Sequence, residues 1–286
     1  GQVRLNGAVS HAGATQLAEG ELVFAANSLT QSLVGVISGN GRLVQQGSGR
    51  LTLVAANTYN GETVVRGGTL MPSNNAALGS ALAGTVVTNG GTLDVGYSGT
   101  DNGANFGDEV ITVSGTGFNG RGAIINSSAR SQYNTFRFMK LAGHTTFGGE
   151  NSAARWDIRN TASNPYLDMN GFTVTKVGSN MVGLTSVPVI NPGHIDIQEG
   201  IFRTESAAAL NGSDANTMTV QNNATYEIYS LVTPIAWSLV MNDGARFGAA
   251  NGNGLAQNVW AGPITLNGYA RMDPYSGYTM TLAGKI

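Results

Sequence analysis

Residues 47–70, GSGRLTLVAANTYNGETVVRGGTL, display the pattern that decides the fold of this chain. Short runs in which Leu and Val alternate with Thr are separated by Gly and Asn. Alternation with a period of two residues is typical of short β-strands with one buried face. Gly and Asn tolerate the tight turns that separate such strands. The stretch therefore predicts a succession of strands and turns, and no helix.

The same pattern recurs along the chain, and repeats of this kind decide the architecture. Three pairs of segments align: residues 5–22 with 53–70, 43–53 with 174–184, and 64–80 with 196–213. The first pair is offset by 48 residues and needs no gap, while the last pair needs one inserted residue. A strand-and-turn unit that returns to the same register builds coils stacked in parallel, which is a β-solenoid. At roughly 22 residues per coil and about 4.8 Å between coils, we expect roughly a dozen coils in one elongated domain over residues 1–286.

Composition excludes several classes of function. The chain has 15 Lys+Arg against 17 Asp+Glu and a net charge of −2, so it lacks the basic face of a nucleic-acid-binding protein. Its densest basic stretch, Arg121 to Arg159, is interleaved with Glu150 and Asp157, which favours a solvated face. There is no Cys, which excludes disulfides and thiol chemistry. No apolar run approaches the length of a transmembrane helix.

Residues 38–80, SGNGRLVQQGSGRLTLVAANTYNGETVVRGGTLMPSNNAALGS, resemble the passenger-associated transport repeat, also called the autotransporter-associated β-strand repeat. The core of the resemblance is carried by Gly39, Gly41, Leu43, Gly47, Gly49, Leu51, Thr52, Leu53, Asn57, Thr58, Tyr59, Gly61, Thr63, Val65, Gly68, Thr69 and Leu70. Gln45 replaces the usual Lys and Ala55 a usual Gly. Residues 5–29 and 172–213 are similar to degenerate copies of this repeat. The resemblance implies a right-handed parallel β-helix, exported and exposed on the bacterial surface, without catalytic residues.

A search for chemistry finds one weak candidate site. The segment TDNGANFGDE (100–109) holds Asp101, Asp108 and Glu109, and carboxylates with Asn carbonyls are ligands that Ca²⁺ prefers. The spacing is not that of an EF-hand, and an exposed polar loop is the simpler interpretation. The three His residues are too far apart to ligate one metal, and no nucleophile, catalytic or cofactor-binding motif occurs. We therefore expect no catalytic residues, no metal and no cofactor.

The three tryptophans, Trp156, Trp237 and Trp260, admit two readings. Core packing is the first, and stacking on sugars is the second. Trp156 alternates with Ile158, which favours an inward position.

These observations favour an extracellular structural β-solenoid that is not an enzyme: a surface stalk, an adhesin passenger or a filament subunit. We expect its coil ends to pair with further coils, covalently or head to tail between subunits, with surface glycans as another class of partner. Two alternatives stay open. A polysaccharide-binding or polysaccharide-cleaving β-helix would show clustered Asp, Arg and aromatic residues on one face. A phage tail-spike-like fibre segment would form a trimer.

Overall fold

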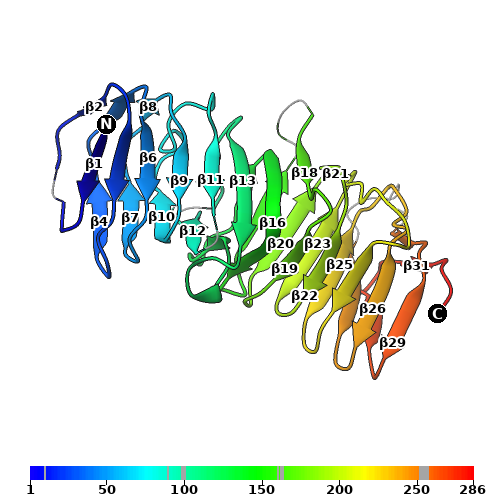
Figure 1. Ribbon diagram of the computed structural model, residues 1–286. Coiled ribbons are helices and arrows are strands. Elements are labelled where there is room, and N and C mark those ends of the chain that lie inside the picture. Colours follow the sequence, from blue (N-terminus) through cyan, green and yellow to red (C-terminus); the bar gives the residue numbers. More distant parts are fainter. Residues whose placement is uncertain (10, 89, 98–100, 160, 162–163, 251–257) are drawn as a thin grey trace.

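A computed structural model describes residues 1–9, 11–88, 90–97, 101–159, 161, 164–250 and 258–286. It is a stack of about 12 parallel coils, with the N-terminus at one end and the C-terminus at the other (Figure 1). The prediction of an all-β parallel solenoid is confirmed. In the described part of the chain, helix is limited to one short 3-10 turn, η1 (Phe118–Gly120). None of the described helices is long and apolar enough to cross a membrane.

Each coil has three faces, because the chain makes three short extended runs before it returns to the same register. The first face consists of β1 (Gln2–Leu5), β3 (Glu21–Phe24), β6 (Arg42–Gln45), β9 (Thr63–Val65), β11 (Thr85–Val87), β13 (Val110–Gly115), the first part of β16 (Phe138–Gly149), β18 (Tyr166–Asp168) and β21 (Val189–Ile190). Beyond β21 this face continues through bridges at Leu210 and Ile235 to β28 (Val259–Trp260) and β31 (Thr281–Leu282). All of these pairings are parallel.

The second face carries the longest unbroken ladder. It consists of β4 (Thr30–Leu33), β7 (Arg50–Leu53), β10 (Gly68–Pro72), β12 (Gly91–Asp94), β14 (Ile124–Asn126), the last part of β16, β19 (Thr173–Lys176), β22 (His194–Ile197), β24 (Thr217–Val220), β26 (Ser238–Asn242) and β29 (Ile264–Asn267). Because β16 bends across both faces, the two ladders form one 19-stranded sheet.

The third face changes character along the rod. Near the N-terminus it consists of three very short strands, β2 (Thr15–Leu17), β5 (Ile37–Gly39) and β8 (Thr58–Tyr59). From the middle of the chain onward it is a separate seven-stranded sheet: β15 (Gln132–Phe136), β17 (Arg155–Arg159), β20 (Met181–Thr185), β23 (Ile201–Glu205), β25 (Thr225–Tyr229), β27 (Arg246–Ala250) and β30 (Arg271–Pro274). This sheet positions the candidate site described below.

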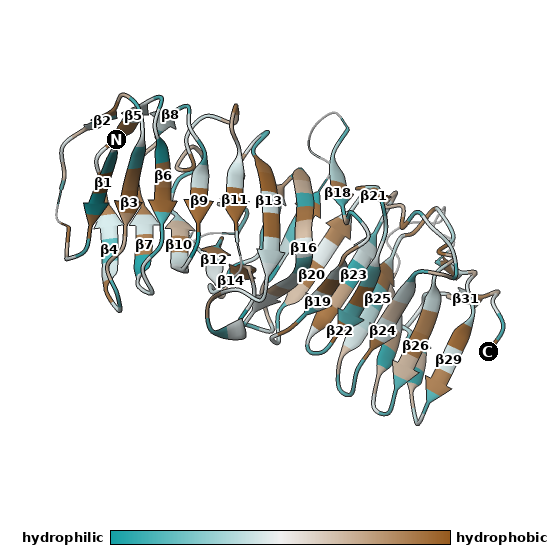
Figure 2. Ribbon diagram, viewed as in Figure 1, coloured by the Kyte–Doolittle hydropathy of each residue, from teal (hydrophilic) through white to brown (hydrophobic). Residues whose placement is uncertain are grey.

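The core consists of inward-facing rows that run along the rod. One first-face row joins, coil by coil, Leu22, Leu43, Thr63, Thr85, Ile111, Met139, Leu167 and Val189, all of them buried. The hydropathy colouring shows the same apolar bands crossing successive strands (Figure 2). Each fully buried Leu, Val or Ile side chain contributes about 1.5–3 kcal/mol to folding. The alternation that predicted strands from sequence is therefore the alternation between this core and the surface.

Corner residues join adjacent coils. Gly68 has φ 57°, and a Cβ there would lie 2.2 Å from the carbonyl oxygen of Gly49 on the coil before it, so only glycine fits. Asn57 accepts a hydrogen bond from the Ile37 N–H (2.8 Å) and donates one to the Ala77 carbonyl (2.7 Å). One buried asparagine side chain thus links three successive coils.

The aligned copies lie one face apart. Leu5 and Leu22 lie on the first face, whereas their equivalents Leu53 and Leu70 lie on the second. Leu5 is stacked under Phe24, and Phe24 under Gln45, so an offset of 48 residues amounts to two coils and one further face. The repeat therefore encodes a strand, a corner and a strand that fit at more than one corner of the solenoid.

Gln45 and Lys176 occupy equivalent positions in the aligned copies 43–53 and 174–184. Their side chains stabilise the same type of corner at two places in the rod. Gln45 is buried and donates from Nε2 to the carbonyls of Gly47 (2.9 Å) and Gly49 (3.1 Å). Lys176 is fully buried and donates from Nζ to three carbonyls, on Val177, Gly178 and Glu199. Burial lowers the pKa of Lys176 to about 7, while the charge of Glu199 acts to raise it. Both side chains therefore satisfy several backbone carbonyls of their corner.

Candidate functional site: a charged strip on the third face

The structure gives the three carboxylates of the candidate calcium loop separate partners. Asp101 accepts a hydrogen bond from the Ser131 N–H (2.7 Å), and Asp108 forms an ion pair with Arg137 (3.3 Å). Glu109 is buried and accepts a hydrogen bond from the Thr85 hydroxyl (2.6 Å). Desolvation raises the pKa of Glu109 to about 7, and this hydrogen bond acts to lower it. Within the described ranges, no three His, Cys, Asp or Glu side chains come together in a way that could hold a metal.

The tryptophans pack in the core and cannot stack on sugars. All three side chains are fully buried. Trp156 donates from Nε1 to the Gly148 carbonyl (3.0 Å), and Trp237 donates to the Asn211 carbonyl (2.8 Å). Trp260 contacts the rings of Tyr226 and Phe247 edge to face. The sugar-stacking reading is therefore wrong for these three residues.

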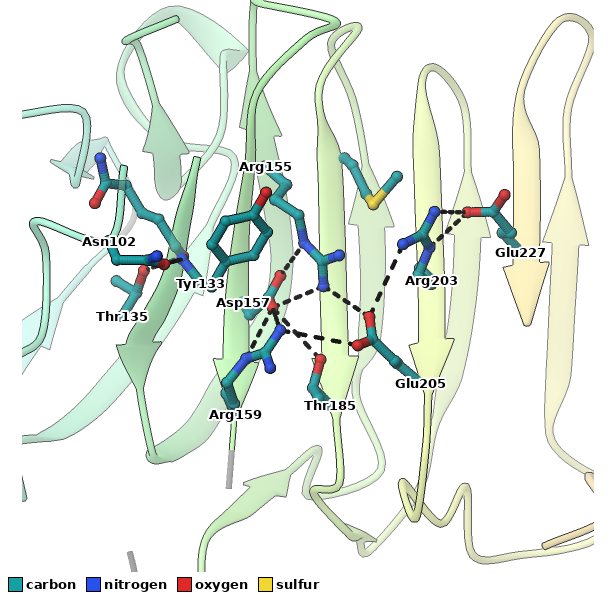
Figure 3. A network of polar contacts seen from close by, with 12 residues as sticks. Asn102, Tyr133, Thr135, Arg155, Asp157, Arg159, Thr185, Arg203, Glu205 and Glu227 are labelled. Atoms are coloured by element: carbon teal, nitrogen blue, oxygen red, sulfur yellow. Dashed lines mark hydrogen bonds and ion pairs between the residues drawn. The ribbon is translucent and has the colours of Figure 1, made fainter. Parts of the chain in front are cut away.

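Charged and tyrosine side chains instead gather on the outer surface of the third-face sheet. Figure 3 shows the part of this surface from Tyr133 to Glu227. We call this surface the charged strip; it consists of Tyr133, Arg155, Asp157, Arg159, Arg203, Glu205, Glu227, Tyr229, Arg246, Arg271, Asp273 and Tyr275. Its inward-facing neighbours on the same strands include Trp156, Phe202 and Phe247, all fully buried. Period-two alternation therefore places aromatic core and charged surface on opposite sides of one sheet.

Asp157 is the centre of the first ion-pair cluster. It is fully buried and is approached by two guanidinium groups, with Arg155 Nε and Nη2 both at 2.7 Å and Arg159 Nη2 at 2.7 Å. Arg155 also pairs with Glu205 one strand beyond β20 (3.0 Å). Burial acts to lower the pKa of Arg155, but the charge of Asp157 raises it above its usual range. One buried carboxylate thus anchors two arginines, and Glu205 connects them across three coils.

Two further clusters follow toward the C-terminus. Glu227 is fully buried and pairs with Arg203 at 2.5 Å. Asp273 pairs with Arg246 (3.0 Å) and with Arg271 (2.7 Å). Burial acts to raise the pKa of Asp273, but the hydrogen bond and charge of Arg246 lower it below its ordinary value. Three of the pairs join different strands, Arg155–Glu205 across β20, Arg203–Glu227 between β23 and β25, and Arg246–Asp273 between β27 and β30, and these link successive coils.

Tyrosine rings lie beneath the arginines. The guanidinium carbon of Arg155 lies 5.0 Å from the centroid of the Tyr133 ring, and that of Arg159 lies 5.7 Å from it. Arg203 lies 5.2 Å from Tyr229, and Arg246 lies 4.7 Å from Tyr275. Each such cation–π contact contributes about 0.5–1 kcal/mol at an exposed site. The stacking orders the arginine side chains in addition to the ion pairs.

Two glycines, Gly183 and Gly248, lie on the outer surface of the strip, and only one of them is needed to make room for an arginine. A Cβ on Gly183 would be 2.5 Å from Asp157 Oδ1 and 2.6 Å from Arg155 Nη2. At Gly248 the nearest atoms would be Glu227 Cγ at 3.7 Å and Arg246 Cζ at 3.8 Å, which is ordinary contact. Gly183 is therefore a spatial requirement of the first cluster, whereas Gly248 is not one of the third.

The charged strip was not predicted from the sequence. The basic stretch up to Arg159 was interpreted as a solvated face, whereas the Arg155 side chain is 10% exposed and its partner Asp157 is fully buried. The signal was present as charges two residues apart in Arg155–Asp157–Arg159, Arg203–Glu205 and Arg271–Asp273. Residues two apart share a face of a strand, but which strand lies beside which could not be read without the coil lengths.

Two comparisons with known proteins agree with the repeat found in the sequence. Residues 43–71 match the family model described as Passenger-associated-transport-repeat. The resemblance found over residues 38–80 is confirmed. An 86-residue alignment, covering 27% of this chain, is 40% identical to the Adhesin BmaC autotransporter of Brucella suis biovar 1 (strain 1330). The aligned part spans 2% of that much longer adhesin, and no solved structure matches this chain. The chain therefore contains an autotransporter passenger repeat within a β-solenoid.

The ion pairs of the charged strip link neighbouring strands, and they also hold its outer polar side chains in fixed positions. Hydrolysis of a glycosidic bond needs two carboxyl groups facing one sugar. Asp157 and Glu227 are instead covered by the arginines that pair with them. The side chains offered outward are chiefly guanidinium groups and tyrosine rings.

Proposed function

We propose that this chain is a rod-forming segment of an extracellular bacterial surface protein, a stalk or adhesin passenger with a mechanical role and no enzymatic activity. The observation that carries the proposal is the continuous buried core that runs through about 12 stacked coils. The match to a passenger repeat and to part of an adhesin autotransporter supports the bacterial surface as its location.

The mechanism proposed is nearest-neighbour stacking. In a solenoid each coil is stabilised mainly by the coils on either side, so length adds reach without needing a larger core. Here the corners add links of their own, as Asn57 bonds to the coil before it and the coil after it. The charged strip does the same on the third face through Arg155 and Glu205. A rod built in this way holds whatever lies beyond it at a distance from the cell.

The proposal includes pairing of the coil ends with further coils. Leu266 on β29 is 46% exposed, although its register partner Met241 is fully buried. Another coil laid on β29 would cover Leu266 and pair the strand edge, and open edges of this kind favour strand addition. The further coil would belong to the same polypeptide or to a second copy. Sedimentation of the purified chain distinguishes these arrangements, and a compact trimer would instead favour the tail-spike-like alternative.

Labelling of intact cells tests the location. An antibody raised against this chain is applied to cells of the source organism before and after permeabilisation, with a cytoplasmic protein as control. We expect full labelling of intact cells and loss of the signal after mild external proteolysis. A signal that appears only after permeabilisation would overturn the proposal. Release of reducing ends from a polysaccharide panel by the purified chain would overturn its non-enzymatic part.

A further inference from the structure

The charges of the strip are arranged by depth. Two of the four carboxylates lie at its floor, since the Asp157 and Glu227 side chains are 0% exposed, while those of Glu205 and Asp273 are 13% and 25% exposed. The arginines rise above them, and the side chains of Arg159, Arg246 and Arg271 are 25%, 27% and 64% exposed. Five arginines and four carboxylates are nearly balanced in number. A ligand approaching the strip nevertheless meets the cations first.

The arginines keep donors that the protein does not use. A guanidinium has five N–H donors in a planar fork. Arg155 and Arg159 each bond to Asp157 through Nε and Nη2, and no partner for Nη1 of either occurs among the described residues. Arg271 forms an ion pair through Nη2 alone. Because the buried carboxylates fix the forks in place, little side-chain entropy remains to be lost when the free donors bind an anion.

The charged strip is an elongated, open surface. It extends over the seven strands from β15 to β30, which lie about 4.8 Å apart. Between its taller side chains lie small ones, Gly183, Thr185, Gly248 and Ala250, all on the same outer surface. Tyr275 is 36% exposed at one end. Such a surface fits a ligand that is extended and repeats its charge, and it does not enclose a small molecule.

We propose that the charged strip binds an extended anionic polysaccharide along the axis of the rod. Carboxylate or sulfate groups of the polymer would accept hydrogen bonds from Arg159 and Arg271, and a sugar ring would lie against the exposed part of Tyr275, whose ring Arg246 covers on one face and whose hydroxyl accepts a hydrogen bond from Arg246 Nη1 (3.3 Å). A nucleic acid fits less well, because its dense phosphates would lie over Asp157 and Glu227 and the chain carries a net charge of −2. The inference adds a binding surface to the proposed rod and does not depend on where the rod is displayed.

Binding is measured with the purified full chain on immobilised polymers by biolayer interferometry. The probes are heparin as a sulfated polymer, polygalacturonate as a carboxylated one, dextran as a neutral one and single-stranded DNA as a non-sugar polyanion. We expect binding to at least one of the two anionic polysaccharides, weakening as salt rises because exposed charges are screened. The two anionic probes identify which acid group is preferred. Equal binding to dextran, or stronger binding to DNA, would overturn the inference.

Arginine variants test whether the strip is the site. Arg271→Gln is expected to weaken binding about threefold, and Arg159→Gln combined with Arg271→Gln about tenfold, the effect of removing partly exposed charge contacts. The matched control is Arg66→Gln, an exposed arginine at a corner outside the strip. Arg271→Lys keeps the charge and is expected to restore most of the affinity. The thermal unfolding of each variant is measured as well, and binding is compared only between variants that are equally stable. Unchanged binding in the double variant, or equal loss in the Arg66 control, would place the site elsewhere.

Discussion

The two halves of the rod solve the same stacking problem with different chemistry. On the third face of the N-terminal half, β2, β5 and β8 are two or three residues long, and their outward residues Gln16, Ser38 and Thr58 are uncharged. On the same face of the C-terminal half, strands from β17 to β27 have five residues each and carry the charged strip. A face of the solenoid can therefore consist of very short strands between corners, or of a wider sheet whose outer surface carries its own ion pairs.

The cores differ in the same direction. Inward rows of the N-terminal half are mainly Leu and Val, with Tyr59 bonded to Thr63 at 2.5 Å. The described ring–ring contacts all involve residues from Phe106 onward, including Trp156 between Phe136 and Phe147. A wider third face encloses a wider interior, and aromatic side chains fill that volume.

The largest effect is expected from removing the central ring of the wider half. Trp156→Ala should lower the free energy of unfolding by about 4 kcal/mol, because a fully buried indole leaves a cavity and an unpaired Gly148 carbonyl. Denaturant unfolding followed by hydrogen exchange of strand peptides measures the change and its location. Trp156→Phe is the control and should cost less than half as much. Equal loss of protection in β3 and β17 would show that the halves unfold as one unit.

Removal of a carboxylate should affect stability strongly in a buried ion pair and weakly in an exposed one. Asp157→Ala leaves Arg155 and Arg159 without their main partner and should cost about 3 kcal/mol, the penalty of an uncompensated buried charge. Its N-terminal counterpart is Glu62→Ala, since Glu62 is 42% exposed and 3.9 Å from Arg42. That variant should change stability by less than about 0.5 kcal/mol. Thermal unfolding of both variants at low and high salt measures the contrast. Similar losses in both would refute a structural role for the strip.

A pH-dependent effect is expected at Glu109, where the chain passes between the halves. Its pKa is about 7 in the folded protein against an ordinary 4.5, so the folded state binds more protons and stability falls as pH rises from 4.5 to 7. Glu109→Gln keeps an acceptor for Thr85 and removes this slope. The variant should be about 2 kcal/mol more stable than the parent at pH 8. Unfolding curves at pH 5 and pH 8 measure the difference, and a variant with the parent's slope would contradict the assignment.

Lys176 should show a slope of the opposite sign. Its pKa of about 7 lies below an ordinary 10.5, so the unfolded state binds more protons in that window and stability rises with pH from 7 to 10.5. Lys176→Gln copies the side chain that occupies the equivalent corner at Gln45. We expect the slope to disappear, which removes a rise in stability of roughly 3–5 kcal/mol across the window, at about 1.4 kcal/mol per pKa unit. Gln45→Lys is the reciprocal variant and should introduce the slope. Unfolding at pH 7 and pH 10 checks both variants.

The smallest effect compares two glycines on one sheet. Gly183→Ala forces a methyl group against Asp157 and Arg155 and should cost about 1 kcal/mol by displacing that ion pair. Gly248→Ala has ordinary contact distances and should be neutral or stabilise slightly, because alanine restricts the unfolded chain more than glycine. Thermal unfolding of the two variants side by side is sufficient. A larger loss at Gly248 than at Gly183 would contradict the geometry.

Much of the fold could be predicted from sequence, because alternation and corner residues are local properties. The alternation over residues 47–70 predicted strands with one buried face, and Leu51 and Leu53 within it are buried; the repeat at residues 38–80 was recognised as well. Strand neighbours across coils could not be predicted, because coil length varies. Leu22 pairs with Leu43, 21 positions later, whereas Ile111 pairs with Met139, 28 positions later. The charged strip depends on those neighbours and so escaped prediction.

The candidate loop shows the opposite limit. Asp108 and Glu109 are adjacent in sequence and look like one acidic group, yet one pairs with Arg137 and the other is buried against Thr85. Asp108 lies in a turn and Glu109 directly precedes β13, so the chain changes direction there and proximity in sequence is a poor guide to a shared site. Gly183 lies within β20, and its role is to leave space above the strand for Asp157 and Arg155.

The 48-residue offset between aligned copies equals two coils and one further face of the three-faced rod. Inserting one such unit would raise everything downstream by two coils and also rotate it by one face about the axis. Duplication of such a unit therefore changes the direction in which a decorated surface points, as well as its position along the rod. A lineage could aim such a surface toward a neighbouring rod or toward open solvent by copy number alone, without altering one of its residues.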